Sequence, residues 1–239
     1  MMKNTIDVCL SPKLIDLYDL EGKIVVVVDI LRATSVMVTA MANGASEIIP
    51  VATLDEAKEY QKKGFLCAAE RGGAQVEGFT LDNSPFSYMS EEIKGQPIVI
   101  TTTNGTLAIT KSVAADEVLV GAFINIAALT KYIAGQHKDV IIHCAGWKGK
   151  TNMEDTLFAG ALTDLLRDTH DLACDTAHLA LNYYLSVKDC LFETVKNSAH
   201  AKRLNKLQII KDIEFCTTQS TYDVIPALQG HKLININRG

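Results

Sequence analysis

The fold of this chain is decided by the stretch Ile24-Val25-Val26-Val27-Val28-Asp29-Ile30-Leu31-Arg32-Ala33-Thr34. An unbroken run of β-branched residues is typical of a strand buried on both faces, which indicates a parallel sheet. Thr34 and Ser35 then offer a cap for an apolar helix that we expect to end at Asn43-Gly44. Ligands of open α/β sheets bind in the crevice at this edge. Asp29 and Arg32 are therefore either site residues or an ion pair that stabilises a turn.

Composition and charge exclude several classes of protein. The 239 residues, 48% of them hydrophobic, can bury the core of a single α/β domain over 1–239. A net charge of -5 argues against nucleic-acid binding, and no apolar run reaches membrane-spanning length. Six dispersed cysteines without a Cys-x-x-Cys pair are typical of reduced thiols. We predict a cytoplasmic protein that binds neither nucleic acid nor membrane, and a homodimer is left open.

Strands alternate with helices along the chain. After the opening unit, we expect strands at 47–52, 65–69, 97–100, 117–121, 139–144 and 232–237, with helices between them and a mainly helical stretch through 211. Thr53 and Glu56 form a capping box at the start of one helix. This alternation predicts a three-layer α/β/α sandwich around a mostly parallel sheet. A faint echo between 27–34 and 99–106 leaves open two similar sub-lobes, divided near residue 96.

Polar residues follow the ends of several expected strands. Because parallel connections place strand-end loops on one side of the sheet, we expect these residues to meet in one crevice. Carboxylates are hard oxygen ligands that suit Mg²⁺, while arginines and the amides of glycine-rich or helix-starting loops suit a phosphate. Each acid alone also fits a helix N-terminus, so a non-catalytic scaffold is a further reading. The residues are Asp29, Arg32, Glu70, Arg71, Thr102, Asn104, Glu154 and Asp155.

Three known phosphate-binding patterns fit incompletely. Leu31 stands where haloacid-dehalogenase-type phosphatases carry a second aspartate, and Lys150 stands where a tyrosine-phosphatase loop carries arginine. Gly149-Lys150-Thr151 matches the end of a nucleotide-binding P-loop, but Cys144 replaces the first glycine. A P-loop-like nucleotide or phosphometabolite binder is therefore the alternative function.

A series of motifs over residues 5 to 227 closely resembles the 2-phosphosulfolactate phosphatase family. The chain departs from the family pattern at Asp82, where that pattern often has glycine. The motifs are Asp29 to Ser35, Glu70-Arg71-Gly72-Gly73, Gly78-Phe79 with Asn83-Ser84-Pro85, Thr101 to Thr106, Cys144-Ala145-Gly146 and Glu154-Asp155.

The resemblance implies a Mg²⁺-dependent phosphatase that converts (R)-2-phospho-3-sulfolactate to 3-sulfolactate and phosphate, a step in coenzyme M biosynthesis. Its partner would be this small anionic phosphorylated substrate. Whether Asp29 attacks phosphorus or binds the metal is left open, as is the choice between Glu154 and Asp155 as a ligand. Ser198 is either a substrate contact or a helix N-cap.

The expected site therefore has three groups of residues. The catalytic residues are Asp29, Arg32, Glu70 and Arg71, and the metal ligands are Asp29, Glu70, Glu154 and Asp155. The substrate-binding residues are Thr102, Thr103, Asn104, Gly105, Lys148 and Ser198.

Overall fold

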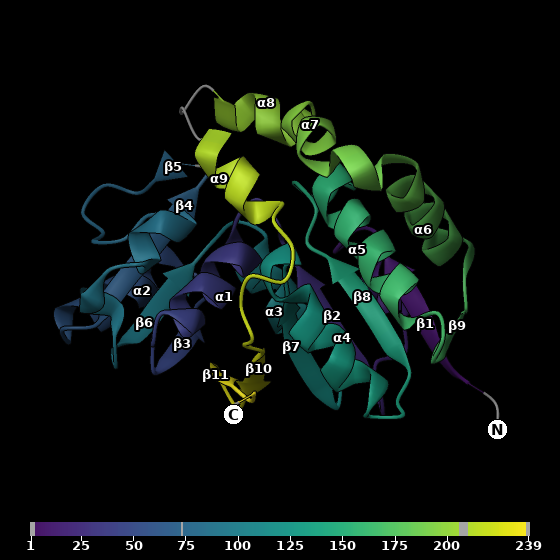
Figure 1. Cartoon of the computed structure of the whole chain (residues 1–239). Helices are drawn as coiled ribbons and strands as arrows, with labels where there is room; N and C mark the ends of the chain where they lie inside the picture. Colours follow the sequence, from purple (N-terminus) through teal and green to yellow (C-terminus); the bar gives the residue numbers. More distant parts are fainter. Residues whose placement is uncertain (1–2, 73, 206–209, 238–239) are drawn as a thin grey trace.

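The protein is built around one large twisted sheet, seen in a computed structural model that describes residues 3–72, 74–205 and 210–237 (Figure 1). The strands are β1 (Asn4–Cys9), β2 (Ile24–Val28), β3 (Glu47–Pro50), β4 (Leu66–Arg71), β5 (Ala74–Gln75), β6 (Pro97–Thr101), β7 (Glu117–Gly121), β8 (Val140–Cys144), β9 (His170–Leu172), β10 (Pro226–Gln229) and β11 (Lys232–Asn235). The helices are α1 (Ala33–Ala42), α2 (Leu54–Lys62), α3 (Gly105–Lys111), α4 (Ile126–Ala134), α5 (Met153–Leu166), α6 (Asp175–Val187), α7 (Leu191–Lys196), α8 (Ala199–Asn205) and α9 (Ile210–Cys216).

The sheet consists of two parallel blocks joined by an antiparallel hairpin. Its strand order is β5-β4-β6-β3-β11-β10-β7-β2-β8-β1-β9. β4, β6 and β3 form one parallel block, and β7, β2, β8, β1 and β9 form the other. The hairpin β10–β11 pairs antiparallel with β7 on one side and with β3 on the other. The predicted α/β sandwich around a mostly parallel sheet is confirmed, while the division near residue 96 stays a prediction.

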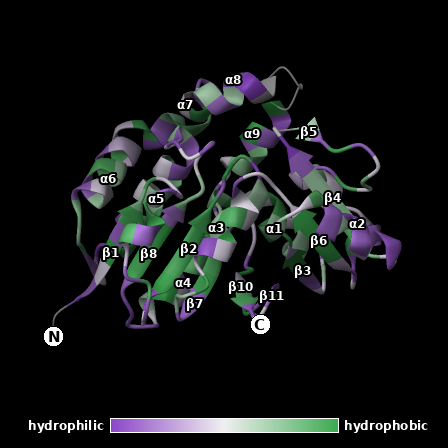
Figure 2. Cartoon of the chain, turned by 180° about the vertical axis from the view of Figure 1, so that it is seen from behind, coloured by the Kyte–Doolittle hydropathy of each residue, from purple (hydrophilic) through white to green (hydrophobic). Residues whose placement is uncertain are grey.

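The buried β-branched strand predicted at the start of the chain is β2. All five of its residues are fully buried, and it lies between β7 and β8. Figure 2 shows this part of the sheet in the hydrophobic colour. Val28 pairs with Gly121 and with Cys144, so the strands on both sides end beside Asp29. The core run therefore fixes the place of the first polar residue that follows it.

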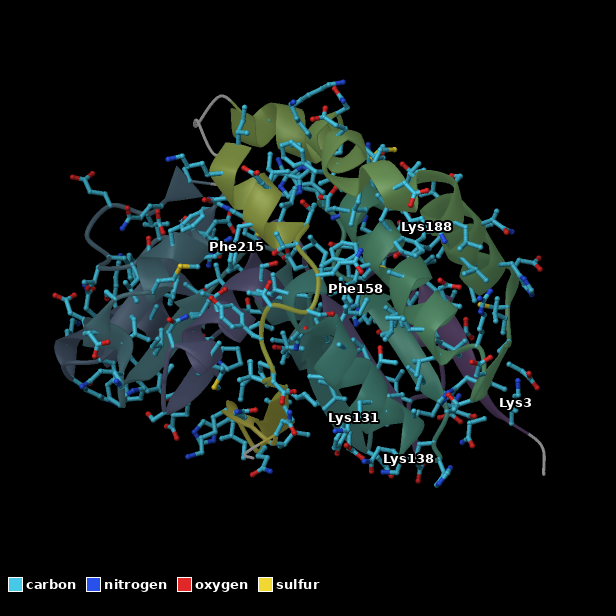
Figure 3. All side chains as sticks on the ribbon, viewed as in Figure 1. Lys3, Lys131, Lys138, Phe158, Lys188 and Phe215 are labelled. Atoms are coloured by element: carbon cyan, nitrogen blue, oxygen red, sulfur yellow. The ribbon has the colours of Figure 1, made fainter. Side chains whose placement is uncertain are left out.

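Helices α4 and α5 lie in front of this parallel block in Figure 1, and α6 packs closely on α5. The labelled side chain of Phe158, on α5, lies in the interior in Figure 3 and is fully buried. At Gly160 an added Cβ would lie 2.1 Å from the carbonyl oxygen of Ala180, so the two helices approach too closely for any side chain. Among the described residues, no helix is long and apolar enough to cross a bilayer.

The predicted cap at Thr34 and Ser35 is wrong. Helix α1 begins at Ala33, and no side chain caps it. The Thr34 hydroxyl instead accepts the N–H of Asp29 at 3.0 Å, and the Ser35 hydroxyl donates to the carbonyl oxygen of Ile30 at 2.9 Å. Both hydroxyls therefore brace the loop that carries Asp29. The expected end of the helix is confirmed, since Asn43 is its C-cap.

The last third of the chain contains strands that the pattern did not predict. β9 pairs with β1 at the edge of the sheet, and β10 pairs with the predicted strand at the C-terminal end of the chain. Helices α7, α8 and α9 lie together over one end of the sheet (Figure 1). That end carries the loops that follow β2 and β8, and the candidate site lies there.

Candidate active site

Residues far apart in sequence line one small hollow at the carboxyl ends of the strands. We call it the Asp29 hollow. Of the predicted site residues, Asp29, Arg32, Glu70 and Asn104 meet here, so the expected convergence of strand ends holds for these four. The lining residues are Asp29, Leu31, Arg32, Glu70, Asn83, Asn104, Trp147 and His200.

Asp29 is a buried carboxyl group on a tightly fixed loop. The backbone N–H of Thr34 donates to its carbonyl oxygen at 2.9 Å. The pKa of Asp29 is raised to about 7, mainly by burial; His200 opposes the shift, and the charges of Glu70 and Glu154 add to it. A cation entering the hollow would therefore favour the ionised form.

Gly105 provides the space that this carboxylate needs. A Cβ at this position would lie 2.7 Å from the Cβ of Ala33 and 3.1 Å from Oδ2 of Asp29. Gly105 therefore lets α3 approach the start of α1 and does not line the hollow.

Glu70 is positioned by Thr103. The N–H of Thr103 donates to Oε2 of Glu70 at 3.2 Å, and the Thr103 hydroxyl lies 3.4 Å from Oε1. Arg71 binds back to the sheet, donating to the carbonyl oxygen of Glu70 at 2.6 Å and to the Thr101 hydroxyl at 3.0 Å. Thr103 and Arg71 do not line the hollow, and both stabilise the segment that presents Glu70.

Arg32 is oriented by an acid that the motifs did not indicate. Its guanidinium forms an ion pair with Asp212 of α9, and both side chains are almost fully buried. The hydroxyl of Ser84 donates to the other oxygen of Asp212 at 2.9 Å. One carboxylate on α9 thus connects the loop after β2 with the loop before η2 (Pro85–Tyr88).

Glu154 and Asp155 have different surroundings. The oxygens of Asp155 accept the backbone N–H groups of Ile30 at 2.9 Å and Gly146 at 3.0 Å. Burial raises the pKa of Asp155, and the neighbouring carboxylates add to the shift while these two amides oppose it. Oε1 of Glu154 lies 2.6 Å from Nδ1 of His200, and Oε2 is buried without a hydrogen-bond partner among the described residues.

The other predicted substrate contacts lie outside the hollow. The hydroxyl of Thr102 accepts the N–H of Thr106 at 3.2 Å. Lys148 donates its backbone N–H to Oδ1 of Asn104 at 3.4 Å, and its amine lies 5.7 Å from the centre of the Trp147 ring. The Ser198 hydroxyl accepts the N–H of Ala201 at 2.9 Å, which matches its alternative reading as an N-cap.

Asn83, Trp147 and His200 line the hollow but were not among the predicted site residues. Asn83 lies in a motif that indicated only a turn. Trp147 directly follows the strand-end motif 144–146, and it is the only tryptophan of the chain, which was a usable signal. His200 reaches the hollow from α8, so its position depends on the packing of the last third of the chain. No local spacing would have placed it beside Glu154.

The acids fit a loosely coordinated divalent cation better than a closed metal cage. Within the described ranges, no three His, Cys, Asp or Glu side chains group closely enough to surround a metal ion. Mg²⁺ does not require such a cage, because it keeps several waters and often takes only one or two protein carboxylates together with substrate phosphate. Asp29 and Glu70 provide two carboxylates in one hollow, and the unpartnered Oε2 of Glu154 marks uncompensated negative charge close by.

Comparison with known proteins places the chain in a family. The family model for 2-phosphosulpholactate phosphatase matches residues 9–231. A probable 2-phosphosulfolactate phosphatase of Thermotoga maritima is 45% identical over 208 residues, which cover 87% of this chain and 90% of that relative. Similarly named proteins of Caldanaerobacter subterraneus and Clostridium botulinum are 42% identical over 216 residues and 35% identical over 237 residues. These matches cover 88% and 97% of this chain and 90% and 99% of the two relatives. With its strand-end acids gathered in one hollow, the chain belongs to the 2-phosphosulfolactate phosphatase family.

Proposed function

We propose that this protein hydrolyses the phosphate ester of a small 2-phospho-acid, (R)-2-phospho-3-sulfolactate or a close relative, to the 2-hydroxy acid and phosphate. The observation that carries the proposal is the Asp29 hollow, where two carboxylates, an arginine and two asparagines converge in a chain of this family. The charges of this lining suit a dianionic phosphate with a cation beside it. The resemblance supports, within the same proposal, a step of coenzyme M biosynthesis in the cytoplasm.

Arg32 and Asn104 are the proposed phosphate ligands. The Asp212 carboxylate fixes the guanidinium of Arg32, so less side-chain freedom is lost when a phosphate binds. The amide of Asn104 is positioned by the backbone N–H of Lys148. The two side chains come from different strand ends, and together they orient the phosphorus for attack.

Asp29 and Glu70 are the proposed Mg²⁺ ligands, since both line the hollow and each carries a carboxylate on a fixed segment. When bound, Mg²⁺ would polarise the phosphoryl oxygens and offset the charge that develops during transfer. Asp155 is left out of the set because backbone amides occupy both of its oxygens.

His200 is the proposed proton donor to the leaving oxygen. Because an ionised carboxylate only accepts hydrogen bonds, Glu154 assigns a proton to Nδ1 of His200 and orients the ring. Nε2 is then the ring nitrogen left for the hollow that the ring lines, and to act as a donor it carries a second proton. Passing this proton from Nε2 to the ester oxygen as the P–O bond breaks gives the hydroxyl of the product and leaves a neutral imidazole protonated on Nδ1.

The P-loop-like alternative is not retained. A P-loop binds phosphate through free backbone amides. Here four N–H groups of the loop after β8 bond within the protein: Gly146 donates to Asp155, Trp147 and Lys150 donate to each other's carbonyl oxygens, and Lys148 donates to Asn104.

The test is phosphate release from a panel of 2-phospho-acids, with Mg²⁺ and with the metal chelated. We expect turnover that requires Mg²⁺ and falls at least about a hundred-fold in Asp29→Asn and in Glu70→Gln, as for the loss of a group that acts on the developing charge. Glu77→Gln is the matched control, because Glu77 is an exposed acid in the segment after Glu70. Full Mg²⁺-dependent activity in both site variants would refute the assignment.

A further inference from the structure

A second hollow adjoins the Asp29 hollow and shares a wall with it. Trp147 and His200 line both. The second hollow, which we call the Arg203 hollow, encloses about 260 Å³ and is also lined by Lys150, Thr151, Ser198 and Arg203. This volume lies just below the range of sites for drug-sized ligands and suits one small anionic arm of a substrate. A substrate held by its phosphate in the first hollow could therefore extend past His200 into the second.

The charge of the Arg203 hollow is not neutralised by the protein. In the described part of the chain, no carboxylate lies within ion-pair distance of Arg203 or Lys150. Glu154 also lines the hollow; its Oε1 is paired with His200 and its Oε2 is buried, so the solvent-exposed charges of the lining are those of Arg203 and Lys150. Elsewhere an exposed arginine such as Arg167 has its own partner, Asp164. The hollow thus presents two positive charges to whatever enters it.

The Trp147 ring restricts the position of Arg203. The guanidinium carbon lies 4.9 Å from the centre of the ring, and the His200 ring lies 5.0 Å from the same centre. Stacking on an aromatic face uses the plane of a guanidinium and leaves its N–H groups to point outward along the edge. This planar fork matches two oxygens of a carboxylate or sulfonate.

We propose that the Arg203 hollow binds a second oxyanion of the substrate, a sulfonate or carboxylate joined by one or two bonds to the carbon that bears the phosphate ester. The inference rests on the proposed phosphatase function. Arg203 is then the residue that selects phosphate monoesters with a second anionic group over monoesters without one, with Lys150 adding charge at the rim. The wall residues Trp147 and His200 separate the reacting phosphate from the selected group.

The experiment compares four phosphate esters that differ only in their anionic arms. 2-Phospho-3-sulfolactate carries a sulfonate and a carboxylate, 2-(phosphooxy)propane-1-sulfonate carries only a sulfonate, 2-phospholactate carries only a carboxylate, and isopropyl phosphate carries neither. In Arg203→Gln we expect KM to rise at least about ten-fold more for the ester whose arm enters the hollow than for isopropyl phosphate. The single-arm esters show which oxyanion this is. Arg203→Lys keeps the positive charge but lacks the planar guanidinium. Its KM for that ester should lie between those of the wild-type protein and Arg203→Gln.

Lys202→Gln is the matched control, because it removes an exposed positive charge one residue away that does not line the hollow. If Arg203→Gln changes KM equally for all four esters, or for none, the inference is overturned.

Calorimetric binding of 3-sulfolactate needs no turnover and separates the two proposals. Wild-type protein that releases no phosphate but binds 3-sulfolactate through Arg203 would refute the phosphatase function alone, and binding that is unaffected in Arg203→Gln would refute the Arg203 hollow as the anion site.

Discussion

Asp29 is the residue at which function opposes stability. Its carboxyl is almost fully buried, and its pKa is raised to about 7, mainly by burial. An acid whose pKa is higher in the folded state than in the unfolded chain favours folding at low pH. That contribution is lost as the pH rises from about 4, the unfolded value, to about 7. At neutral pH and above, the ionised carboxylate destabilises the folded state. The same ionised form is the one that would bind a cation.

Asp29→Asn should therefore be more stable than the wild-type protein at pH 8 while losing its activity. The amide keeps the shape and removes the buried charge, and it also relieves Asp155, whose pKa Asp29 raises. Thermal unfolding without divalent cations, at pH 8 and at pH 5, is the measurement. The difference in Tm between the variant and the wild-type protein should be smaller at pH 5, because wild-type Asp29 is then protonated. Buried His143, whose pKa is lowered to about 4, is the same in both proteins and cancels. A variant that melts below wild type at pH 8 would contradict this.

Gly105→Ala tests the close approach beside Asp29. The added methyl meets Ala33 at 2.7 Å and the Asp29 carboxylate at 3.1 Å, so α3 or the Asp29 loop must shift. We expect a loss of about 1–3 kcal/mol in the free energy of unfolding together with a lower kcat. Gly135→Ala is the control, since its added methyl makes only an ordinary contact, at 3.5 Å, with the carbonyl oxygen of Tyr132. Equal behaviour of the two variants in denaturant unfolding and in turnover would exclude a special role for Gly105.

The residues that line the site were predictable only where the neighbouring sequence indicates their position. Asp29 and Glu70 follow runs whose burial is evident from their composition, so their place at a strand end could be read directly. Asp212 and His200 lie on helices of the last third, and their partners Arg32 and Glu154 are 180 and 46 residues away. Proximity over such distances is set by packing, which a local pattern does not contain.

At the scale of elements, α9 holds two segments of the site together. Asp212 bonds to both Arg32 and Ser84, while Phe215, labelled in Figure 3, packs its ring 5.4 Å from that of Phe86 in η2. One helix of two turns thus holds the loop after β2 and the segment around Ser84 against each other. The phosphate-binding geometry of Arg32 depends on the docking of this helix.

Asp212→Asn should weaken the contact between α9 and the loop after β2. Removing one charge of a buried ion pair leaves Arg32 without its carboxylate and should lower the free energy of unfolding by up to about 3–5 kcal/mol. KM for the phosphate ester should rise as well, because Arg32 is no longer fixed. Urea unfolding and steady-state kinetics measure the two effects. Glu214→Gln, an exposed acid on the same helix, is the control. An unchanged KM in a folded Asp212→Asn protein would show that Arg32 is positioned without Asp212.

Element prediction succeeded for uniform apolar runs and failed for short strands in mixed sequence. β2, β6, β7 and β8 are buried apolar runs, and the capping box at Thr53 is present as predicted. β9 and β10 have three and four residues, and they become strands only because β1 and the partner strand of the hairpin offer free hydrogen-bonding edges. Neither segment contains an apolar run or an alternation that would distinguish it from a loop.

At the scale of the whole molecule, Mg²⁺ should stabilise the fold through the site. A ligand that binds only the native state at a hundred times its Kd adds about 2.7 kcal/mol. We therefore expect MgCl₂ to raise the Tm of the wild-type protein at pH 8 and to raise that of Asp29→Asn much less. Scanning calorimetry with NaCl at matched ionic strength controls for screening of the surface charges. Equal increases in Tm in both proteins would place the metal elsewhere. The same increase in Tm with NaCl would exclude a specific effect of the metal.

The hairpin β10–β11 has a consequence for how the chain reaches its native state. It joins the sheet between β7 and β3, yet the residues that form it are synthesised after every other strand. Until residues 226–235 leave the ribosome, β7 and β3 each present an unpaired edge, and exposed edges are templates for pairing with other chains. Nascent chains that end before the hairpin should therefore require chaperones, and aggregation during synthesis should depend on the last strands more than on the active site.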